Sequence, residues 1–122
     1  MKKLLAALAF VIAIPVLAQT TSPAEFKEMK HSFGKIPQGK PVTTEFTFSN
    51  TTDKPIVIES ATGSCGCTVP EYPQTPILKE KSGVIKVTYN AANVGAFTKT
   101  VTVKFAGVAE PVVLTIEGEV VK

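Results

Sequence analysis

The stretch FTKTVTVKF, residues 97–105, decides the fold class of this chain. Apolar and polar residues alternate along it, which is the period of two expected of a half-buried β-strand. The predicted inward face consists of large apolar residues: Phe97, Val101, Val103 and Phe105. The predicted outward face is polar: Thr98, Thr100, Thr102 and Lys104. Lys99 interrupts the apolar face near its start, where a long side chain can reach out to water.

The same alternation recurs on both sides of this stretch. It predicts strands near residues 41–49, 56–59, 85–89 and 112–120, with turn residues between them and no amphipathic helix. Within the first of these strands, Phe46 and Phe48 are expected inside and Thr47 outside. Strands joined by short turns pair antiparallel, and two such sheets bury their apolar faces against each other. We therefore predict an all-β, immunoglobulin-like antiparallel β-sandwich of about seven strands, with a small barrel as the alternative.

Two segments do not follow the alternation. The apolar residues between Phe26 and Phe33 do not keep one parity, which predicts a bulge or a switch between sheets. Three prolines, Pro70, Pro73 and Pro76, follow one another closely. Proline removes a donor from the ladder of a sheet, so we expect residues 70–76 to form a long surface connection.

The N-terminal residues have the layout of a secretory signal peptide. Lys2 and Lys3 precede an uncharged apolar stretch, and small residues at Val16 and Ala18 fit cleavage before Gln19. The alternative is a retained membrane anchor, but a spanning helix needs roughly 20 apolar residues, and Pro15 would break this shorter one. We predict a signal peptide over 1–18, a short polar leader over 19–24 and one domain over 25–122.

Removal of the signal peptide would leave little net charge. The whole chain has 13 Lys and Arg against 10 Asp and Glu. Without Lys2 and Lys3 the formal net charge is +1, and no basic cluster remains. A nucleic-acid-binding protein needs a cationic face to displace counterions, so this class is excluded.

Four segments together resemble a known family of exported bacterial domains: HSFGKI at 31–36, EFTFSN at 45–50, SCGCTVP at 64–70 and FTKTVTV at 97–103. The family is domain of unknown function 1573, common in Bacteroidetes-type bacteria, and the resemblance covers residues 26–121. It is similar to the immunoglobulin-like domains of the major sperm protein and Hydin type. The resemblance implies a seven-stranded sandwich exported across the inner membrane and implies no activity. Related eukaryotic domains serve in protein–protein scaffolding, which is an analogy of fold.

Cys65 and Cys67 form the one unusual motif, with Gly66 between them. In an extended strand they would lie about 6.6 Å apart, which is too far for a disulfide with Cβ atoms roughly 3.5–4.5 Å apart. Gly66 at positive φ would bring them together in a tight turn. We predict a turn over 64–68 with a Cys65–Cys67 disulfide in an oxidising compartment. Such a bridge adds little stability, any strain in it would make it easier to reduce than an ordinary structural bridge, and a local staple is favoured over a redox role.

The other candidate residues give no catalytic or metal site. His31 is the only histidine; a Cys–His pair with Cys65 or Cys67 is geometrically possible, but a lone histidine is far more often a surface or turn residue. Those three residues are fewer than the four ligands of a structural zinc site, although two thiolates can hold copper(I). We therefore predict no cofactor.

Three further polar motifs have structural explanations. Glu117 and Glu119 are expected on the solvent face of a terminal strand. Asn50-Thr51-Thr52 matches the glycosylation pattern in a turn that we expect to be accessible, and it is interpreted as a turn. The threonine row in 98–102 is what an exposed strand prefers.

These observations predict a non-enzymatic module that binds proteins or has a structural role at the cell envelope. The expected location is the periplasm or the extracellular space, with no membrane span after removal of the signal. Unpaired strand edges can accept an extended partner segment, and the proline-rich segment 70–76 offers a rigid surface. The alternative is a thiol–disulfide redox or copper(I)-binding protein that uses Cys65 and Cys67.

Overall fold

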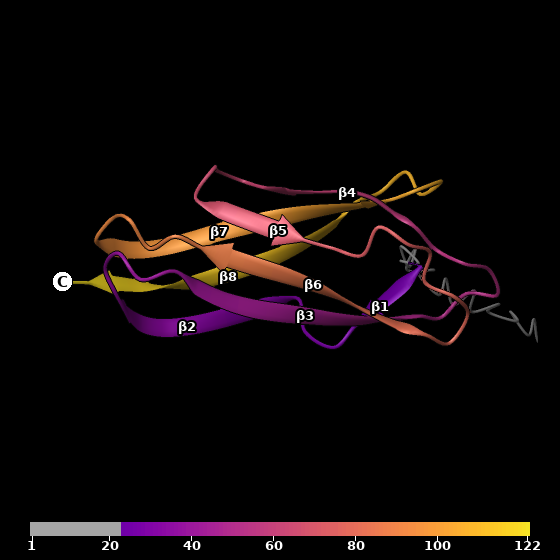
Figure 1. Ribbon diagram of the computed structural model, residues 1–122, viewed down its shortest axis with the longest axis horizontal. Coiled ribbons are helices and arrows are strands. Elements are labelled where there is room, and N and C mark those ends of the chain that lie inside the picture. Colours follow the sequence, from indigo (N-terminus) through magenta and orange to yellow (C-terminus); the bar gives the residue numbers. More distant parts are fainter. Residues whose placement is uncertain (1–22) are drawn as a thin grey trace, which may run out of the picture.

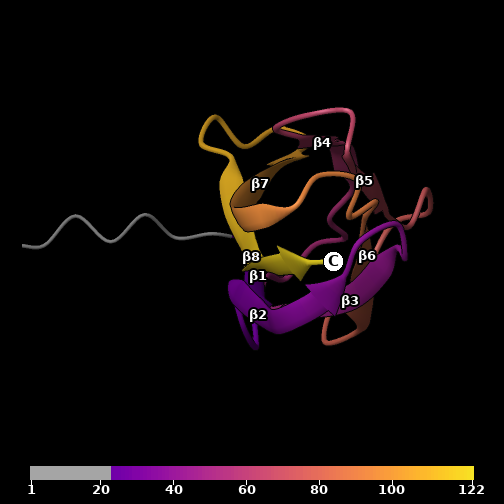
Figure 2. The same ribbon diagram turned by 90° about the vertical axis from the view of Figure 1, so that its left-hand side faces the viewer.

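The computed structural model describes residues 23–122 as two packed β-sheets (Figure 1). Its strands are β1 (Ala24–Phe26), β2 (Lys30–Pro37), β3 (Val42–Asn50), β4 (Ile58–Gly63), β5 (Thr68–Glu71), β6 (Ser82–Tyr89), β7 (Gly95–Phe105) and β8 (Val112–Val121). One sheet has the order β1-β3-β6-β5 and the other β2-β8-β7-β4. The end-on view shows them enclosing one core (Figure 2). Within the described range, no helix could span a membrane.

The predicted signal peptide and its cleavage site lie outside the described residues. So does most of the predicted leader. Its last residue, Ala24, differs from the prediction because it opens β1 and is buried.

The core follows the alternation of the sequence. Phe46, Phe48, Val101 and Val103 are all at most 2% exposed, as predicted. Thr102, between two of them, is exposed. Strand β7 pairs antiparallel with both β8 and β4, so its inward residues lie in the middle of one sheet. The all-β sandwich is therefore confirmed.

The N-terminal segment switches between the two sheets, as its broken alternation predicted. Strand β1 pairs with β3 in one sheet, and β2 pairs with β8 in the other. The register of β2 shifts between Ser32 and Lys35, which marks a bulge. The β2–β8 pair is parallel, so the expectation of antiparallel pairing throughout is wrong at this one place. No hairpin connects β2 to β8, because the chain enters this sheet from β1 in the other sheet. Strand β2 can therefore run parallel to β8.

The expected surface connection over 70–76 begins later than predicted. Pro70 lies inside β5, where it is opposite Val87 of β6. Strand β5 is an edge strand, and an edge strand can hold proline because one side of it has no ladder to break. The two sheets contain eight strands, whereas the sequence predicted about seven. The short edge strand β5 was not among the predicted strands.

Candidate functional site

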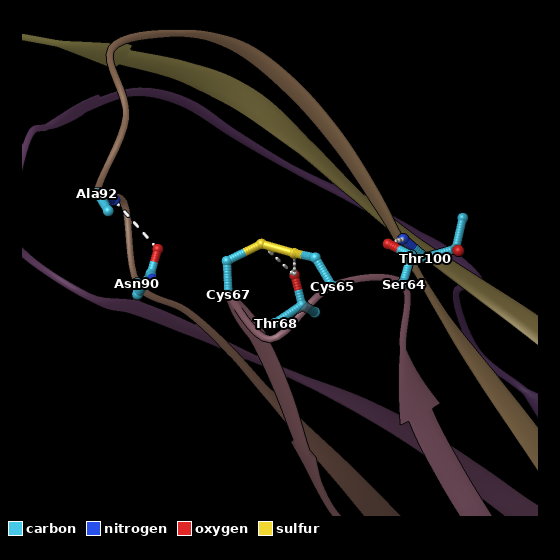
Figure 3. The surroundings of a disulfide bond; sticks show 7 residues. All are labelled: Ser64, Cys65, Cys67, Thr68, Asn90, Ala92 and Thr100. Carbon is cyan, nitrogen blue, oxygen red and sulfur yellow. Dashed lines mark hydrogen bonds between the residues drawn. A yellow bond between two sulfur atoms is a disulfide. The ribbon is translucent and has the colours of Figure 1, made fainter.

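The turn that carries the two cysteines joins edge strands of the two sheets. Strand β4 is an edge of one sheet and β5 an edge of the other. They pack against each other on the same side of the sandwich (Figure 2). The linking residues form a bend and turn between Gly63 and Thr68, at the strand end where the sequence predicted it. Cys65 and Cys67 are joined there by a disulfide, with their Cα atoms 5.2 Å apart (Figure 3).

Hydrogen bonds hold the backbone of this turn independently of the sulfur atoms. They are Ser64 N–H to Thr100 C=O (2.8 Å), Thr100 N–H to Ser64 Oγ (3.1 Å), Thr68 N–H to Cys65 C=O (3.2 Å) and Asn90 N–H to Cys67 C=O (3.0 Å). Two of these bonds tie the start of the turn to β7, and one ties its end to the residue after β6. The turn is thus anchored in both sheets.

The disulfide lies at the border between the core and solvent. Both cysteines are half-buried, and Cys67 packs against the hydrophobic core. Thr68 is 2% exposed, and its hydroxyl oxygen lies 3.7 Å from each sulfur (Figure 3). One hydroxyl group therefore contacts both sulfur atoms from the protein side.

The glycine that shapes the turn is not the one that the motif suggested. Gly66 is not among the residues with positive φ, so the proposed reason for its presence is wrong. A Cβ added at Gly66 would meet nothing within 4 Å, whereas one at Gly63 would lie 2.1 Å from the Thr68 carbonyl oxygen. The chain closes onto itself at Gly63, so it is this residue that must lack a side chain.

Strand β4 has unpaired backbone groups on its outer side. In an antiparallel pair, every second residue exchanges hydrogen bonds with the partner strand. Ser64 N–H bonds to Thr100 C=O, so Thr62 and Ser60 also take hydrogen-bonded positions opposite β7. The N–H and C=O groups of Ala61 and Gly63 then point away from β7. No backbone or side-chain group of the described residues bonds to them outside the ladder. This row is called the β4 edge below.

Strand β5, by contrast, offers no free donor on its outer side. Asn90 N–H bonds to Cys67 C=O, so Thr68 and Pro70 take the outward positions. The N–H of Thr68 already bonds to Cys65 C=O, and proline has no N–H. The other two edges are also poor templates, since β1 has three residues and β2 has a bulge and ends at Pro37.

The structure does not bring His31 to the cysteines. His31 lies in β2 and the cysteine turn follows β4, at opposite edges of the same sheet. The His31 ring packs edge-on against Phe33 with centroids 4.6 Å apart. In the described part of the chain, no three His, Cys, Asp or Glu side chains group as metal ligands. The Cys–His pair and the three-ligand site considered from the sequence do not form among the described residues.

The acidic and threonine-rich faces have structural partners. Glu117 forms an ion pair with Lys30 at 3.3 Å, and Glu119 is exposed on the same strand. Thr98, Thr100 and Thr102 lie opposite Glu117, Thr115 and Val113 of β8. These side chains occupy the outer surface of an ordinary sheet face.

Asn50 is buried, which corrects the expectation that its turn leaves it accessible. Its side chain is fully used: Nδ2 donates to the carbonyls of Lys54 (2.7 Å) and Ile77 (2.9 Å), and Oδ1 accepts from Thr52 N–H (2.8 Å) and Thr52 Oγ1 (2.7 Å). With 2% exposure, the amide is closed to a glycosylating enzyme in the folded domain. The signal for this role was present in the sequence, because Asn followed two residues later by Thr also forms a side-chain-to-backbone turn.

A family model described as a protein of unknown function (DUF1573) matches residues 24–120. The chain belongs to the DUF1573 family. This agrees with the resemblance of residues 26–121 found from the motifs. No curated protein sequence matches the chain.

Solved structures share the fold of this DUF1573 domain at low identity. An ASH/PapD-like domain of human CEP192 has a TM-score of 0.72 and 8% identity over 91% of this chain and 96% of that domain. A protein of unknown function from Porphyromonas gingivalis W83 has a TM-score of 0.67 and 12% identity, over 79% of this chain and 46% of that one. The Vibrio cholerae VesB protease has a TM-score of 0.63 and 13% identity, over 80% of this chain and 32% of that one. The DUF1573 chain spans less than half of the last two proteins, and these likenesses show an immunoglobulin-like, PapD-like sandwich.

Proposed function

We propose that this DUF1573 domain is exported and acts as a non-enzymatic module that binds an extended segment of a partner protein along the β4 edge. The observation that carries the proposal is the unpaired N–H and C=O of Ala61 in the row called the β4 edge; at Gly63 the Thr68 carbonyl approaches the backbone, so a partner strand pairs at Ala61. Such a row is a template for another strand, because main-chain hydrogen bonds supply affinity without a preformed pocket.

The side chains of β4 suit a docking strand. Proteins protect open edges with lysine, proline or a bulge. From Ser60 to Gly63 the strand has none of these and carries only small, uncharged side chains. Glu59 lies at its start, beside a register shift. The partner segment is therefore extended and pairs with Ala61 through its main chain.

Export rests on the N-terminal residues. Lys2, Lys3, the apolar stretch and the small residues before Gln19 together support secretion and residence at the cell envelope. Intact-mass measurement on protein recovered from the envelope should give a chain that begins at Gln19. A mass that includes residues 1–18 would contradict the proposed processing.

A proline at position 61 tests the binding edge. Ala61→Pro removes an N–H that points away from β7, so the bond ladder with β7 is kept while the edge loses a donor. Ala61→Ser keeps the N–H and is the matched control. Affinity capture from envelope extracts should retain the same partner with the wild type and Ala61→Ser. Binding to Ala61→Pro should fall at least tenfold, and equal capture by all three proteins would refute the β4 edge.

A further inference from the structure

We propose that the Cys65–Cys67 disulfide is a thiol–disulfide exchange site, which accepts two electrons from a partner dithiol. This activity is additional to strand binding and does not depend on it. Each domain exchanges one electron pair with its partner, so the reaction is compatible with a non-enzymatic module.

The disulfide can open without loss of the fold. It links residues only two apart in the sequence, and a loop this small contributes little to stability through chain entropy. The four hydrogen bonds of the turn involve no sulfur atom. The backbone is therefore held in place when the bond breaks, and the two sulfur atoms remain close enough to rejoin.

An incoming thiol can reach the sulfur atoms. Cys65 and Cys67 are both half-buried rather than enclosed. Gly66 between them is exposed, and the space where its Cβ would lie is open to at least 4 Å. No side chain on the linking residue covers the bond. Cys67 packs against the core and Cys65 does not, so Cys65 Sγ is the atom open to attack.

Thr68 supplies the hydrogen bond that the departing sulfur needs. Its hydroxyl lies 3.7 Å from Cys67 Sγ and equally far from Cys65 Sγ (Figure 3). A thiolate is a strong acceptor, so a donor already in place stabilises it as the S–S bond breaks. Because Thr68 is almost fully buried, its hydroxyl faces little competition from water.

The exchange proceeds in two displacements. A partner thiolate attacks Cys65 Sγ and forms a mixed disulfide, while Cys67 leaves as a thiolate, receives the Thr68 hydrogen bond and then takes a proton from water. The second partner thiolate attacks the partner sulfur of the mixed disulfide and releases Cys65, which is protonated in turn. The partner dithiol loses two electrons and two protons and becomes a disulfide, and Cys65 and Cys67 gain them.

Reaction of the oxidised, folded chain with reduced glutathione and with dithiothreitol tests the site. We expect reduction under native conditions with an unchanged β-sheet circular dichroism spectrum. Acid quenching followed by peptide mass mapping should find glutathione on Cys65. Reduction that occurs only after unfolding, or glutathione found on Cys67 instead, would overturn the proposal.

Variants of Thr68 separate the chemical role of its hydroxyl from a packing role. Thr68→Val keeps the shape and should slow exchange about tenfold, as expected for loss of a hydrogen bond to a charged group. Thr68→Ser restores a hydroxyl and should react at the wild-type rate, as should Thr102→Val on the outer face. An unchanged rate in Thr68→Val would overturn the assignment. Ala61→Pro should not alter exchange with small thiols, so failure of the strand-binding proposal is distinguishable.

Discussion

Two turns of this domain use their polar atoms in opposite ways. In the turn after β3, the Asn50 amide is 2% exposed and makes four hydrogen bonds within the protein. In the turn after β4, Cys65 and Cys67 are half-buried, and their sulfur atoms share one hydroxyl contact. In the first turn, the polar atoms of the Asn50 side chain are all bonded to groups of the protein itself and stabilise the fold. In the second turn, the disulfide and the neighbouring β4 edge are the groups on which the proposed exchange and strand binding rest.

Removal of the core residue under the first turn should have the largest effect. Phe48 is fully buried two residues before Asn50 and packs edge-on against Phe105, with ring centroids 5.9 Å apart. Phe48→Ala should lower the free energy of unfolding by about 3–5 kcal/mol, through lost burial and the cavity left behind. Urea denaturation measures it. Thr102→Ser, on the outer face of β7, should change stability little, and equal losses would contradict the strand register.

Loss of the Asn50 amide should have the next largest effect. Asn50→Ala removes four hydrogen bonds at once, two donated to the Lys54 and Ile77 carbonyls and two accepted from Thr52, so the domain should lose about 2–3 kcal/mol. Thermal and urea unfolding measure the change. Expression of the wild type in a glycosylating host should give no added glycan mass. A glycan on Asn50 in folded protein would contradict the burial and hydrogen bonding of the Asn50 side chain.

Glycine substitutions compare the crowded position Gly63 with the uncrowded position Gly66 in the second turn. Gly63→Ala puts a Cβ against the Thr68 carbonyl and forces the backbone to move. We expect a loss of about 1–3 kcal/mol, typical of overpacking. Gly66→Ala meets nothing and should leave both stability and the disulfide intact. Urea denaturation and thiol counting compare the two variants. A larger loss of stability in Gly66→Ala than in Gly63→Ala would contradict the claim that Gly63 is the residue that must lack a side chain.

Removal of the disulfide should have the smallest effect of the four. Replacing Cys65 and Cys67 together by serine should cost about 1.5 kcal/mol, the loop-closure value for so short a link. Comparison of the oxidised, reduced and double-serine proteins by urea unfolding measures it. Unfolding of the reduced protein at room temperature would show that the second turn is as essential as the first.

Much of the fold could be predicted from the sequence because the period of two is a local signal. The alternation over 97–105 assigned the faces of β7 correctly, and the broken parity after Phe26 predicted the switch between sheets. The strand β5 was missed because Pro70 within it and the prolines that follow are a local signal against a strand, whereas an edge position that tolerates proline is a property of the assembled sheet.

The candidate site was predicted only in part. The turn at 64–68 followed from the geometry of closely spaced cysteines, but the reason assigned to Gly66 was wrong. The contact that requires a glycine lies between Gly63 and the Thr68 carbonyl. Such a close approach depends on how the chain folds back between the two sheets, so no local pattern could reveal it.

The sequence by itself determined the sandwich and the inward and outward faces of its main strands, because these depend on the order of apolar and polar residues along the chain. Its motifs, the stretch 64–70 above all, also pointed to the family. Only the tertiary structure decided which polar groups remain available. It buried Asn50, separated His31 from the cysteines and placed Thr68 beside both sulfur atoms. It also left the outward N–H and C=O of Ala61 in β4 without a hydrogen bond among the described residues, whereas β5 offers no free donor on its outer side. The physical reason is that burial and the pairing of strand edges depend on segments distant in sequence.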